Sequence, residues 1–553
     1  MAVLRALTRP VRYLSLVAGA LPVLAFPAAN LEFVAWFGLV PGLLLIRAAP
    51  GRREAAVRGW WLGTGFLLAG MYWLAPSIGP GLLLVAVVLG ALWTGVAVST
   101  WTLLRSPLNL PRALAALVVV PSFWLVLEWI RSWQALGGPW NVLGASQWQH
   151  PAILALAAVG GVWLVSFAIV AANVGIVIVL VSGRLGLRAL GALATAVVIA
   201  AGPVAFALTP AAPAVRQVTL ALVQPGVKRN PASRINDSLA LSAALAPPTG
   251  NTQPDSGPPG STASRAGRAG LIVWGESSVY YLQPGGPLLR HIEALAASTG
   301  AEILVNQDSV HDGKKTKVAV LVGPHGITGE YVKTRLVPFG EYIPFRQQLS
   351  WLTSISRAAP VNMTPGTGAH VLQATIPGQR PLTIGVLICF ESAFPDMSRV
   401  DTDHGAQVII YQTSDVTFQD TWALAQHASL GALRAAETGR PVVQAALTGD
   451  SAAFDSRGRL LSWFGSSRDG VDLVHLSLPA ASVRTPYDRF GDYVPWTAVV
   501  IAAIACGVAL LRRRGDWPGF PTRHRVRDGG EAIQGGPACG ASTAAAGQPG
   551  TGD

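Results

Sequence analysis

Residues 152–181 read AILALAAVGGVWLVSFAIVAANVGIVIVLV, a run that contains no charged side chain. A helix that crosses a bilayer needs about 20 consecutive apolar residues, because the hydrocarbon core is about 30 Å thick. The run is long enough to meet this requirement even if the helix is tilted. It therefore predicts a helix that spans a membrane.

Similar apolar runs occur on both sides of this stretch, near residues 13–29, 31–46, 60–77, 80–104, 113–130, 189–208 and 494–511. Each is close to the length that a membrane crossing requires. Hydrophobic residues make up 51% of the 553-residue chain and charged residues only 13%, whereas soluble domains carry about 25% charged residues. This composition excludes a disordered chain, a disulfide scaffold and a simple soluble enzyme, and we predict eight spans.

The net charge of +12 at first suggests a nucleic-acid partner. The arginines, however, lie before the first run and after the second, fourth, sixth and eighth runs, at Arg5, Arg9, Arg12, Arg47, Arg52, Arg53, Arg58, Arg105, Arg112, Arg184, Arg188, Arg512, Arg513 and Arg514. Basic residues in alternate loops are typical of the positive-inside rule, whereas a nucleic-acid site would gather them on one folded surface. We therefore predict no nucleic-acid partner, and we expect both termini to be cytoplasmic.

The distribution of apolar runs divides the chain into four predicted parts. Residues 1–212 form a membrane domain with seven spans, 213–490 an extracytoplasmic domain, 491–514 the eighth span and 515–553 a disordered cytoplasmic tail. Within the second part, residues 246–270 are rich in Pro, Gly, Ser and Thr, which is typical of a flexible insertion.

The extracytoplasmic part alternates short apolar strands with helical stretches. The predicted strands are 217–223, 271–274, 302–306, 317–322, 382–389, 407–411 and 441–446, and the predicted helices are 287–299 and 421–438. Strands made of nearly continuous Val, Ile and Leu are buried on both faces. The pattern predicts a layered α/β domain.

Cys389 is the strongest indication of chemistry. Of the three cysteines, Cys506 lies in the last predicted span and Cys539 in the tail, so Cys389 has no disulfide partner in the outer compartment. A lone thiol in an oxidising compartment indicates a reactive group, although a buried Cys can also serve only as a small apolar residue. Its place at the end of a strand, where α/β proteins carry their sites, favours a nucleophile.

A nucleophilic thiol needs a base and a group that stabilises the oxyanion. His427 is the best placed of the nine histidines, but we expect it to have a surface or packing role. Carboxylates and a lysine offer an alternative: Glu276 follows the strand 271–274, and Lys333 precedes Glu341 by eight positions. Lysines are few, namely Lys228, Lys314, Lys315, Lys317 and Lys333.

Three segments together resemble the catalytic segments of the nitrilase superfamily: LIVWGESS (271–278), KTRLVPFGEYIP (333–344) and IGVLICFES (384–392). The predicted spans around them resemble the membrane-bound branch of that superfamily, the bacterial apolipoprotein N-acyltransferases. QVTLALVQPG (217–226) and EWIRSWQALGGPWNVLGASQ (128–147) resemble the same branch. The resemblance covers roughly residues 10–510.

The resemblance implies an αββα sandwich beside the membrane helices, and a triad on Glu276, Lys333 and Cys389. Glu341 and Glu391 correspond to further carboxylates of the family, and we expect both to orient Lys333 or Glu276. No metal and no cofactor is implied.

The implied reaction transfers a fatty acyl chain from a phospholipid to the N-terminal amine of a diacylglyceryl-cysteine on an apolipoprotein, through a Cys thioester. The implied protein is a monomer of the bacterial cytoplasmic (inner) membrane.

The sequence departs from the family pattern at three places. Gly275 stands where Pro is common, which predicts a looser turn. Phe390 stands where Tyr often follows the Cys, which removes a hydroxyl donor, and we expect it to be a supporting residue of the active site, as are Glu341 and Glu391. TSDVTFQDTW (413–422) replaces an Asn-Asp-x-Trp-Phe-type loop.

Aromatic and acidic residues outside the triad are candidates for substrate contacts. Asp415 and Trp422 remain in the altered loop 413–422. We predict that these two residues, together with Trp140 and Trp148, contact the substrate. The alternative for the tryptophans is an anchoring role at the membrane interface.

Three alternatives stay open at this level. A membrane-tethered amidase or hydrolase would use the same triad with water, and an inactive paralogue would keep the fold alone. A transporter or scaffold would place charged residues inside the spans, and the eight runs contain only Glu32, at the start of the second run, and Glu128, near the end of the fifth.

Overall fold

The computed structural model describes residues 2–227, 230–247, 268–311, 313–349 and 361–515. The predicted insertion at 246–270 lies mostly outside these residues, and the predicted tail at 515–553 lies almost wholly outside them. Internal contacts divide the chain into two units, Met1–Ala505 and Cys506–Asp553. The elements and contacts described below belong to the first unit, except for the end of the last helix.

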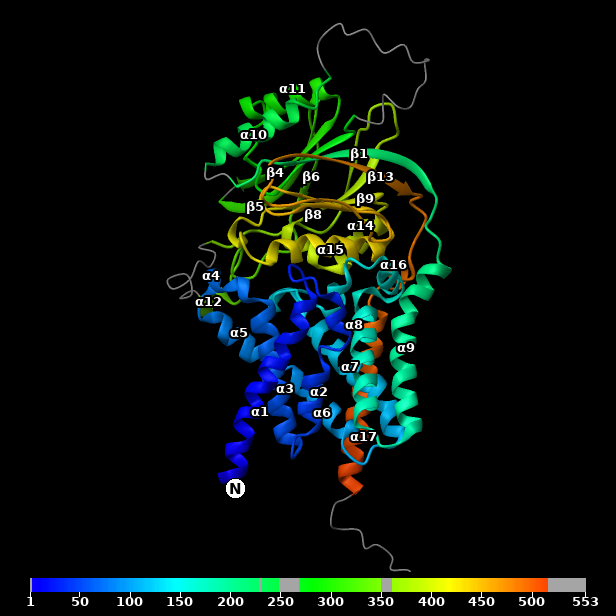
Figure 1. Ribbon diagram of the computed structural model, residues 1–553. Coiled ribbons are helices and arrows are strands. Elements are labelled where there is room, and N and C mark those ends of the chain that lie inside the picture. The colour runs from blue at the N-terminus through cyan, green and yellow to red at the C-terminus, as the bar shows by residue number, and fades with distance from the viewer. Residues whose placement is uncertain (1, 228–229, 248–267, 312, 350–360, 516–553) are drawn as a thin grey trace, which may run out of the picture. The chain divides into compact units, whose positions relative to one another are not determined.

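Apolar helices make up the N-terminal part and the C-terminal end of the described chain (Figure 1). They are α1 (Ala2–Ala20), α2 (Val40–Arg47), α3 (Arg52–Gly70), α4 (Ala75–Ile78), α5 (Gly81–Gly90), α6 (Trp93–Leu104), α7 (Leu110–Arg131), α8 (Pro151–Val181), α9 (Leu185–Leu208) and α17 (Tyr493–Gly515). Among the described residues, five stretches are long and apolar enough to cross a membrane: Gly81–Leu104, Leu110–Arg131, Pro151–Val181, Leu185–Leu208 and Tyr493–Arg512. A multi-helix membrane domain is thereby confirmed, while the count of eight spans stays a prediction.

The second predicted span is wrong as a single helix. Residues 31–46 form a 3₁₀ helix, Glu32–Trp36, followed by the eight-residue helix α2. Pro41 lies in the first turn of α2, and proline is tolerated there because the first N–H groups of a helix have no partner within it. The apolar run therefore contains a helix start, which its hydropathy alone does not reveal.

The long run from which the membrane domain was predicted contains a break. Within α8, Gly160 and Gly161 leave the helical conformation, and Gly161 has φ 71°. The freed N–H of Val162 donates to Oε1 of Glu437 at 2.7 Å. A Cβ on Gly161 would lie 2.6 Å from the ring of Tyr487. At the break, α8 therefore contacts a carboxylate and an aromatic ring from the α/β part of the chain.

The α/β part contains two sheets (Figure 1). The first has the order β13-β1-β2-β4-β5-β6 with β3 beside β4, and the second has the order β12-β11-β10-β9-β8-β7. The strands are β1 (Ala214–Gln224), β2 (Leu271–Trp274), β3 (Val279–Tyr280), β4 (Glu302–His311), β5 (Lys314–Gly323), β6 (Gly326–Val332), β7 (Val371–Ala374), β8 (Leu382–Ile388), β9 (Val408–Thr413), β10 (Val442–Ala446), β11 (Ser451–Phe454), β12 (Leu460–Phe464) and β13 (Gly470–Pro479). All seven predicted strands are present; β3, β6, β7, β11, β12 and β13 were not predicted.

Helices cover the outer faces of the two sheets. Contacts place α10 (Pro231–Ala243) and α11 (Pro287–Thr299) against the first sheet, and α14 (Pro395–Asp403) and α15 (Ala423–Thr438) against the second. The remaining short helices are α12 (Arg346–Leu349) and α16 (Pro486–Phe490). One apolar core contains buried side chains from both sheets and another lies between the first sheet and its helices. The predicted αββα sandwich is confirmed.

Proline and glycine mark ends of the two predicted helices, α11 and α15. Helix α11 begins with Pro287 and is followed by Gly300 at φ 71°, and α15 is followed by Gly439 at φ 68°. Proline suits the first helical turn, and glycine adopts the left-handed conformation that ends a helix.

Parallel strands bring the carboxyl ends of β2 and β8 to one region. β2 runs parallel to β1 and β4, and β8, β9 and β10 are parallel to one another. Gln412, at the end of β9, donates from Nε2 to the carbonyl oxygen of Trp274 at 2.8 Å. The N–H of Glu276 donates to the carbonyl oxygen of Thr413 at 3.1 Å. These bonds join the two sheets where the candidate residues emerge.

Replacing Gly161 with Ala tests the break in α8. The new methyl group would meet the buried ring of Tyr487 in a backbone conformation that L residues rarely adopt, so we expect the free energy of unfolding to fall by about 2 kcal/mol or more. Thermal unfolding followed by tryptophan fluorescence measures the change. Gly186→Ala, in α9 with no atom near the added Cβ, is the control and should not lower the melting temperature.

Candidate active site

Cys389 occupies the turn that follows β8. It begins a 3₁₀ helix, Cys389–Ala393, and its φ is 52°. A non-glycine residue in this left-handed region costs about 1–3 kcal/mol and persists only where its surroundings hold it. The thiol is free and half-buried. The turn therefore presents a partly accessible thiol on a strained backbone, which suits a nucleophile.

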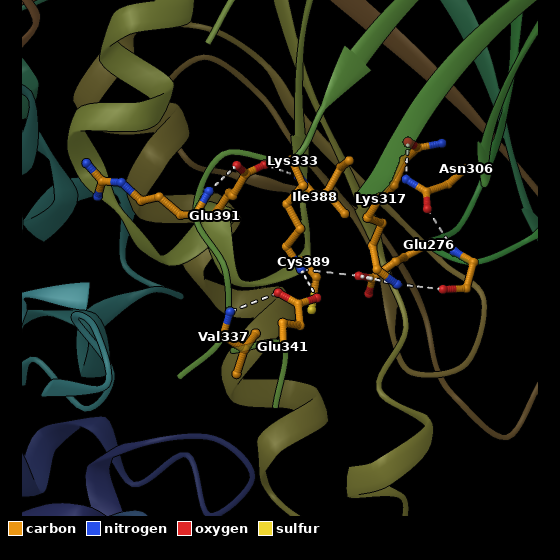
Figure 2. Close-up of polar contacts among 12 residues, drawn as sticks. Glu276, Asn306, Lys317, Lys333, Val337, Glu341, Ile388, Cys389 and Glu391 are labelled. Carbon is orange, nitrogen blue, oxygen red and sulfur yellow. Dashed lines mark hydrogen bonds and ion pairs between the residues drawn. The ribbon is translucent and has the colours of Figure 1, made fainter. Parts of the chain in front are cut away.

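Glu276 follows β2 and faces the thiol from the other sheet. The residue is buried, with 4% of its surface exposed, and its carboxylate forms a hydrogen bond with Cys389. Two ammonium groups contact the same oxygen, Oε1: Nζ of Lys333 at 3.3 Å and Nζ of Lys317 at 3.2 Å. Figure 2 shows these side chains converging on one point.

Glu341 completes the pairing of Lys333. Its Oε1 lies 2.7 Å from Lys333 Nζ, and its Oε2 accepts from the N–H of Val337 at 2.8 Å. Lys333 is fully buried, and a buried ammonium is tolerated only with opposite charges and hydrogen bonds around it. Of the two partners expected for Glu341, Lys333 and Glu276, the structure shows the contact with Lys333.

Charge sets the protonation of the three central groups. Burial opposes ionisation of Glu276, but the charges of Lys317 and Lys333 outweigh it and lower the pKa of Glu276 to about 2. Burial, followed by the charge of Glu276, raises the pKa of the Cys389 thiol. Burial opposes the charge of Lys333, yet Glu341 and Glu276 raise its pKa. The resting site thus holds a thiol, a carboxylate and an ammonium, which is the state that a general-base mechanism requires.

Glu391 does not make the predicted contact with Lys333 or Glu276. It is fully buried, and its Oε1 accepts from the N–H groups of Thr334 at 2.7 Å and Arg335 at 2.9 Å. Its Oε2 accepts from the N–H of Ile388 at 2.8 Å. Glu391 therefore joins the backbone after Lys333 to the backbone before Cys389 (Figure 2).

Lys317 is a site residue that the sequence reasoning missed. Besides Glu276, its Nζ contacts Asp308 Oδ1 at 2.9 Å and Ser277 Oγ at 2.7 Å. Ser277 has φ 54°, and its N–H donates to Asn306 Oδ1 at 3.0 Å. Because lysines are rare in the chain, each was a candidate site residue, but only the pairing of the strands shows that Lys317, as well as Lys333, approaches Glu276.

His427, for which a surface or packing role was expected, is not at the surface. It is 2% exposed, with Nδ1 3.0 Å from Asp415 Oδ1 and Nε2 3.2 Å from the carbonyl oxygen of Cys389. Asp415, predicted as a substrate contact, is also buried and faces this histidine. His427 thus lies on the carbonyl side of Cys389, with Asp415 beyond it.

Gly275 does not loosen the turn as predicted. A Cβ at this position would lie 2.1 Å from the backbone nitrogen of Leu447, which follows β10. The close approach of these two backbones requires glycine here, because a backbone atom cannot move aside as a flexible side chain can.

The predicted aromatic contacts lie in different surroundings. Trp140 is buried and donates from Nε1 to Gln426 Oε1 at 2.9 Å, beside the ring of His427. Trp148 is buried against Phe454 and Trp463.

The other two predicted aromatics also differ from each other. Trp422 is half-buried, and its ring packs on that of Tyr72. Phe390 is buried, and its ring packs on Phe394 at a centroid distance of 4.9 Å.

The arrangement can activate a thiol and stabilise a negatively charged oxygen. Among the described residues, no group of three or more His, Cys, Asp and Glu side chains is arranged to hold a metal ion. The roles of the triad and of the surrounding residues stay predictions.

Comparisons with known proteins agree with these segments. Residues 18–175 match the apolipoprotein N-acyltransferase N-terminal domain, and residues 219–482 match the carbon-nitrogen hydrolase family. An apolipoprotein N-acyltransferase of Rhizobium meliloti is 30% identical over 512 residues, which cover 83% of this chain and 88% of that protein. One from Geobacter metallireducens is 27% identical over 530 residues, covering 90% and 95%.

Among solved structures, a carbon-nitrogen hydrolase superfamily protein from Xanthomonas campestris is 17% identical. The match covers 50% of this chain and 96% of that chain, with a TM-score of 0.35.

Replacing Glu391 with Gln tests the joint between the two segments. An amide would place a donor against backbone donors, so we expect the free energy of unfolding to fall by about 2–4 kcal/mol. Thermal unfolding measures the change in stability, and the rate of Cys389 alkylation by iodoacetamide shows whether the turn at Cys389 is disturbed. Glu330→Gln, exposed on β6, is the control. An unchanged melting temperature in Glu391→Gln would contradict the structural role.

Proposed function

The chain belongs to the apolipoprotein N-acyltransferase family, and we propose that its acyl group passes through a thioester on Cys389. The protein is an acyltransferase of the carbon-nitrogen hydrolase superfamily that acts on lipoproteins in a membrane. The donor in this proposal is a membrane phospholipid, and the acceptor is the N-terminal amine of a diacylglyceryl-cysteine.

The proposed setting is the inner membrane of a bacterium, where apolar helices and family membership place the protein. We further propose that the catalytic domain faces the extracytoplasmic side, with both termini in the cytoplasm. The alternating basic loops support this orientation. The working unit is proposed to be a monomer.

In the first step, Glu276 takes the proton of the Cys389 thiol, and the sulfur attacks the ester carbonyl of the donor. Nζ of Lys333 and backbone N–H groups stabilise the resulting oxyanion. The carbon–oxygen bond of the ester then breaks, and protonated Glu276 returns its proton to the leaving oxygen. A lysophospholipid departs, and a thioester remains on Cys389.

In the second step, the neutral amine of the lipoprotein attacks the thioester carbonyl. Glu276 accepts the amine proton, the carbon–sulfur bond breaks, and the same proton returns to the sulfur. The products are an amide and the resting thiol. Because the two substrates react in turn, ping-pong kinetics are expected.

The convergence of Glu276, Lys333 and Cys389 is the observation that carries the proposal. Contacts between the membrane domain and the segments around the site support lipid substrates. Gln134, just after α7, donates to the carbonyl oxygen of Leu336 at 2.9 Å, and Trp140 binds Gln426 in α15. The acyl acceptor in such a site is proposed to be a lipid-anchored amine rather than water.

Intact mass spectrometry tests the acyl-enzyme. After incubation of the detergent-purified protein with phospholipid, we expect a mass gain of one fatty acyl group that hydroxylamine removes. Cys389→Ala should show none, because the thiol is the acceptor. Addition of a diacylglyceryl peptide should discharge the adduct and form an N-acyl peptide.

The products separate the alternatives. Free fatty acid with no N-acyl peptide would indicate a membrane-tethered hydrolase. Neither product, from a correctly folded protein, would contradict the proposal and indicate an inactive paralogue.

Lys317→Met should move the acid limb of the kcat/KM profile to higher pH. Among the charges that lower the pKa of Glu276, that of Lys317 has the largest effect. Loss of this charge therefore raises the pKa of Glu276, and Glu276 becomes protonated at a higher pH. We expect activity near about pH 8 to be retained and activity near about pH 5 to fall. Lys315→Met, exposed on the same strand, is the control, and an identical profile in both variants would refute the assignment.

A further inference from the structure

His427 and Asp415 form a buried pair that the mechanism above does not use. His427 Nδ1 lies 3.0 Å from Asp415 Oδ1. On the other side of the ring, Nε2 lies 3.2 Å from the carbonyl oxygen of Cys389 and 2.9 Å from Ser392 Oγ. His427, Asp415 and Ser392 are all buried. The pair therefore reaches the nucleophile through its backbone, not through its sulfur.

The partners determine the protonation of the ring. The carbonyl oxygen of Cys389 can only accept, so Nε2 must carry a proton to bind it. An ionised carboxylate also only accepts, so Nδ1 must carry one as well. Ser392 Oγ donates to the same carbonyl at 2.8 Å and can accept from Nε2. This set of partners fits an imidazolium paired with the Asp415 carboxylate.

The carbonyl of Cys389 belongs to the peptide that also carries the N–H of Phe390. A trans peptide is planar, so its C=O and N–H point in opposite directions. Fixing the carbonyl toward His427 therefore fixes the N–H of Phe390 on the opposite edge. Because Cys389 has φ 52°, the backbone conformation at this residue is sparsely populated and needs contacts from outside the turn.

We propose that His427, held by Asp415, is a positioning residue that orients the Cys389–Phe390 peptide so that the N–H of Phe390 donates to the oxyanion. The inference rests on the proposed function, because it assigns a donor for the oxyanion formed at Cys389. It also gives a reason for a buried charge pair next to the nucleophile. Ser392 adds a second donor to the same carbonyl.

The charged groups around the pair define its pH dependence. Glu276 acts on His427 from the turn after β2, and burial, with a contribution from the charge of Asp415, raises the pKa of the neighbouring Asp450. Burial opposes the charge of His427, but Asp415 and the hydrogen bonds outweigh it and raise the pKa of His427. The imidazolium is thus present below this raised pKa and is lost as the pH rises through it, and one of its two bonds is lost at the same time.

An activated ester tests the inference at the thiol itself. p-Nitrophenyl butyrate forms the same oxyanion on Cys389 whatever the natural donor is, and the nitrophenolate burst gives the acylation rate. We expect His427→Gln and Asp415→Asn to slow acylation by about 10–100-fold, less than the loss of about 100–1000-fold when an oxyanion donor is removed, because the donor is misoriented and not absent, with KM within about twofold. The wild type should lose acylation at alkaline pH, and His427→Gln should lack this limb.

Alkylation of Cys389 distinguishes loss of the oxyanion donor from a general structural defect, which would slow both reactions. Iodoacetamide reacts with the thiol without forming an oxyanion, so both variants should be alkylated within about threefold of the wild-type rate. Ser429→Ala, a buried residue of the same helix whose hydroxyl binds the carbonyl of Gln426, should match the wild type in both reactions.

Each remaining outcome is decisive. Acylation and alkylation slowed equally, acylation unchanged, or a rise in KM alone would each overturn the positioning role. If His427→Gln does not fold, Asp415→Asn, which keeps the size of the side chain, gives the same comparison. A normal burst without transfer from phospholipid would reject the proposed function while leaving the positioning role standing.

Discussion

The buried ammonium of Lys333 is the constraint on which the site depends. A charge removed from water is stable only with opposite charges close by, and removing one partner of such a pair costs about 3–5 kcal/mol. Glu276 and Glu341 supply these charges at 3.3 and 2.7 Å. Since the two carboxylates come from different loops, their pairing with one lysine fixes those loops together, and the carboxylate next to Cys389 stays ionised.

A second requirement is that the turn at Cys389 be held from several sides. Glu391 binds the backbone N–H of Ile388 in front of the turn, and His427 and Ser392 bind the carbonyl of Cys389 behind it. These contacts offset the strain of a left-handed residue. Cys389, the proposed nucleophile, is therefore kept in place through its backbone and not through its sulfur.

Helix α15 connects this turn to the membrane helices. Its residue Gln426 binds Trp140, its next residue His427 binds the nucleophile turn, and Glu437, near its C-terminal end, caps the break in α8 at Val162. One buried helix thus contacts both the reacting segment and the apolar helices. This arrangement joins the α/β part of the chain to the apolar helices, which suits the lipid substrates proposed above.

The sequence by itself determined that the chain has apolar membrane helices, the strands that precede Glu276 and Cys389, and the family, because apolar periodicity and short motifs are local properties of the chain. The breaks in residues 31–46 and in α8 were not predictable from hydropathy, which does not register a helix start or a pair of glycines. Lys317, His427 and the backbone role of Glu391 were decided only by tertiary structure. Their partners lie on other strands, loops and helices, and the buried charges are stabilised by proximity in space that no spacing in the sequence records.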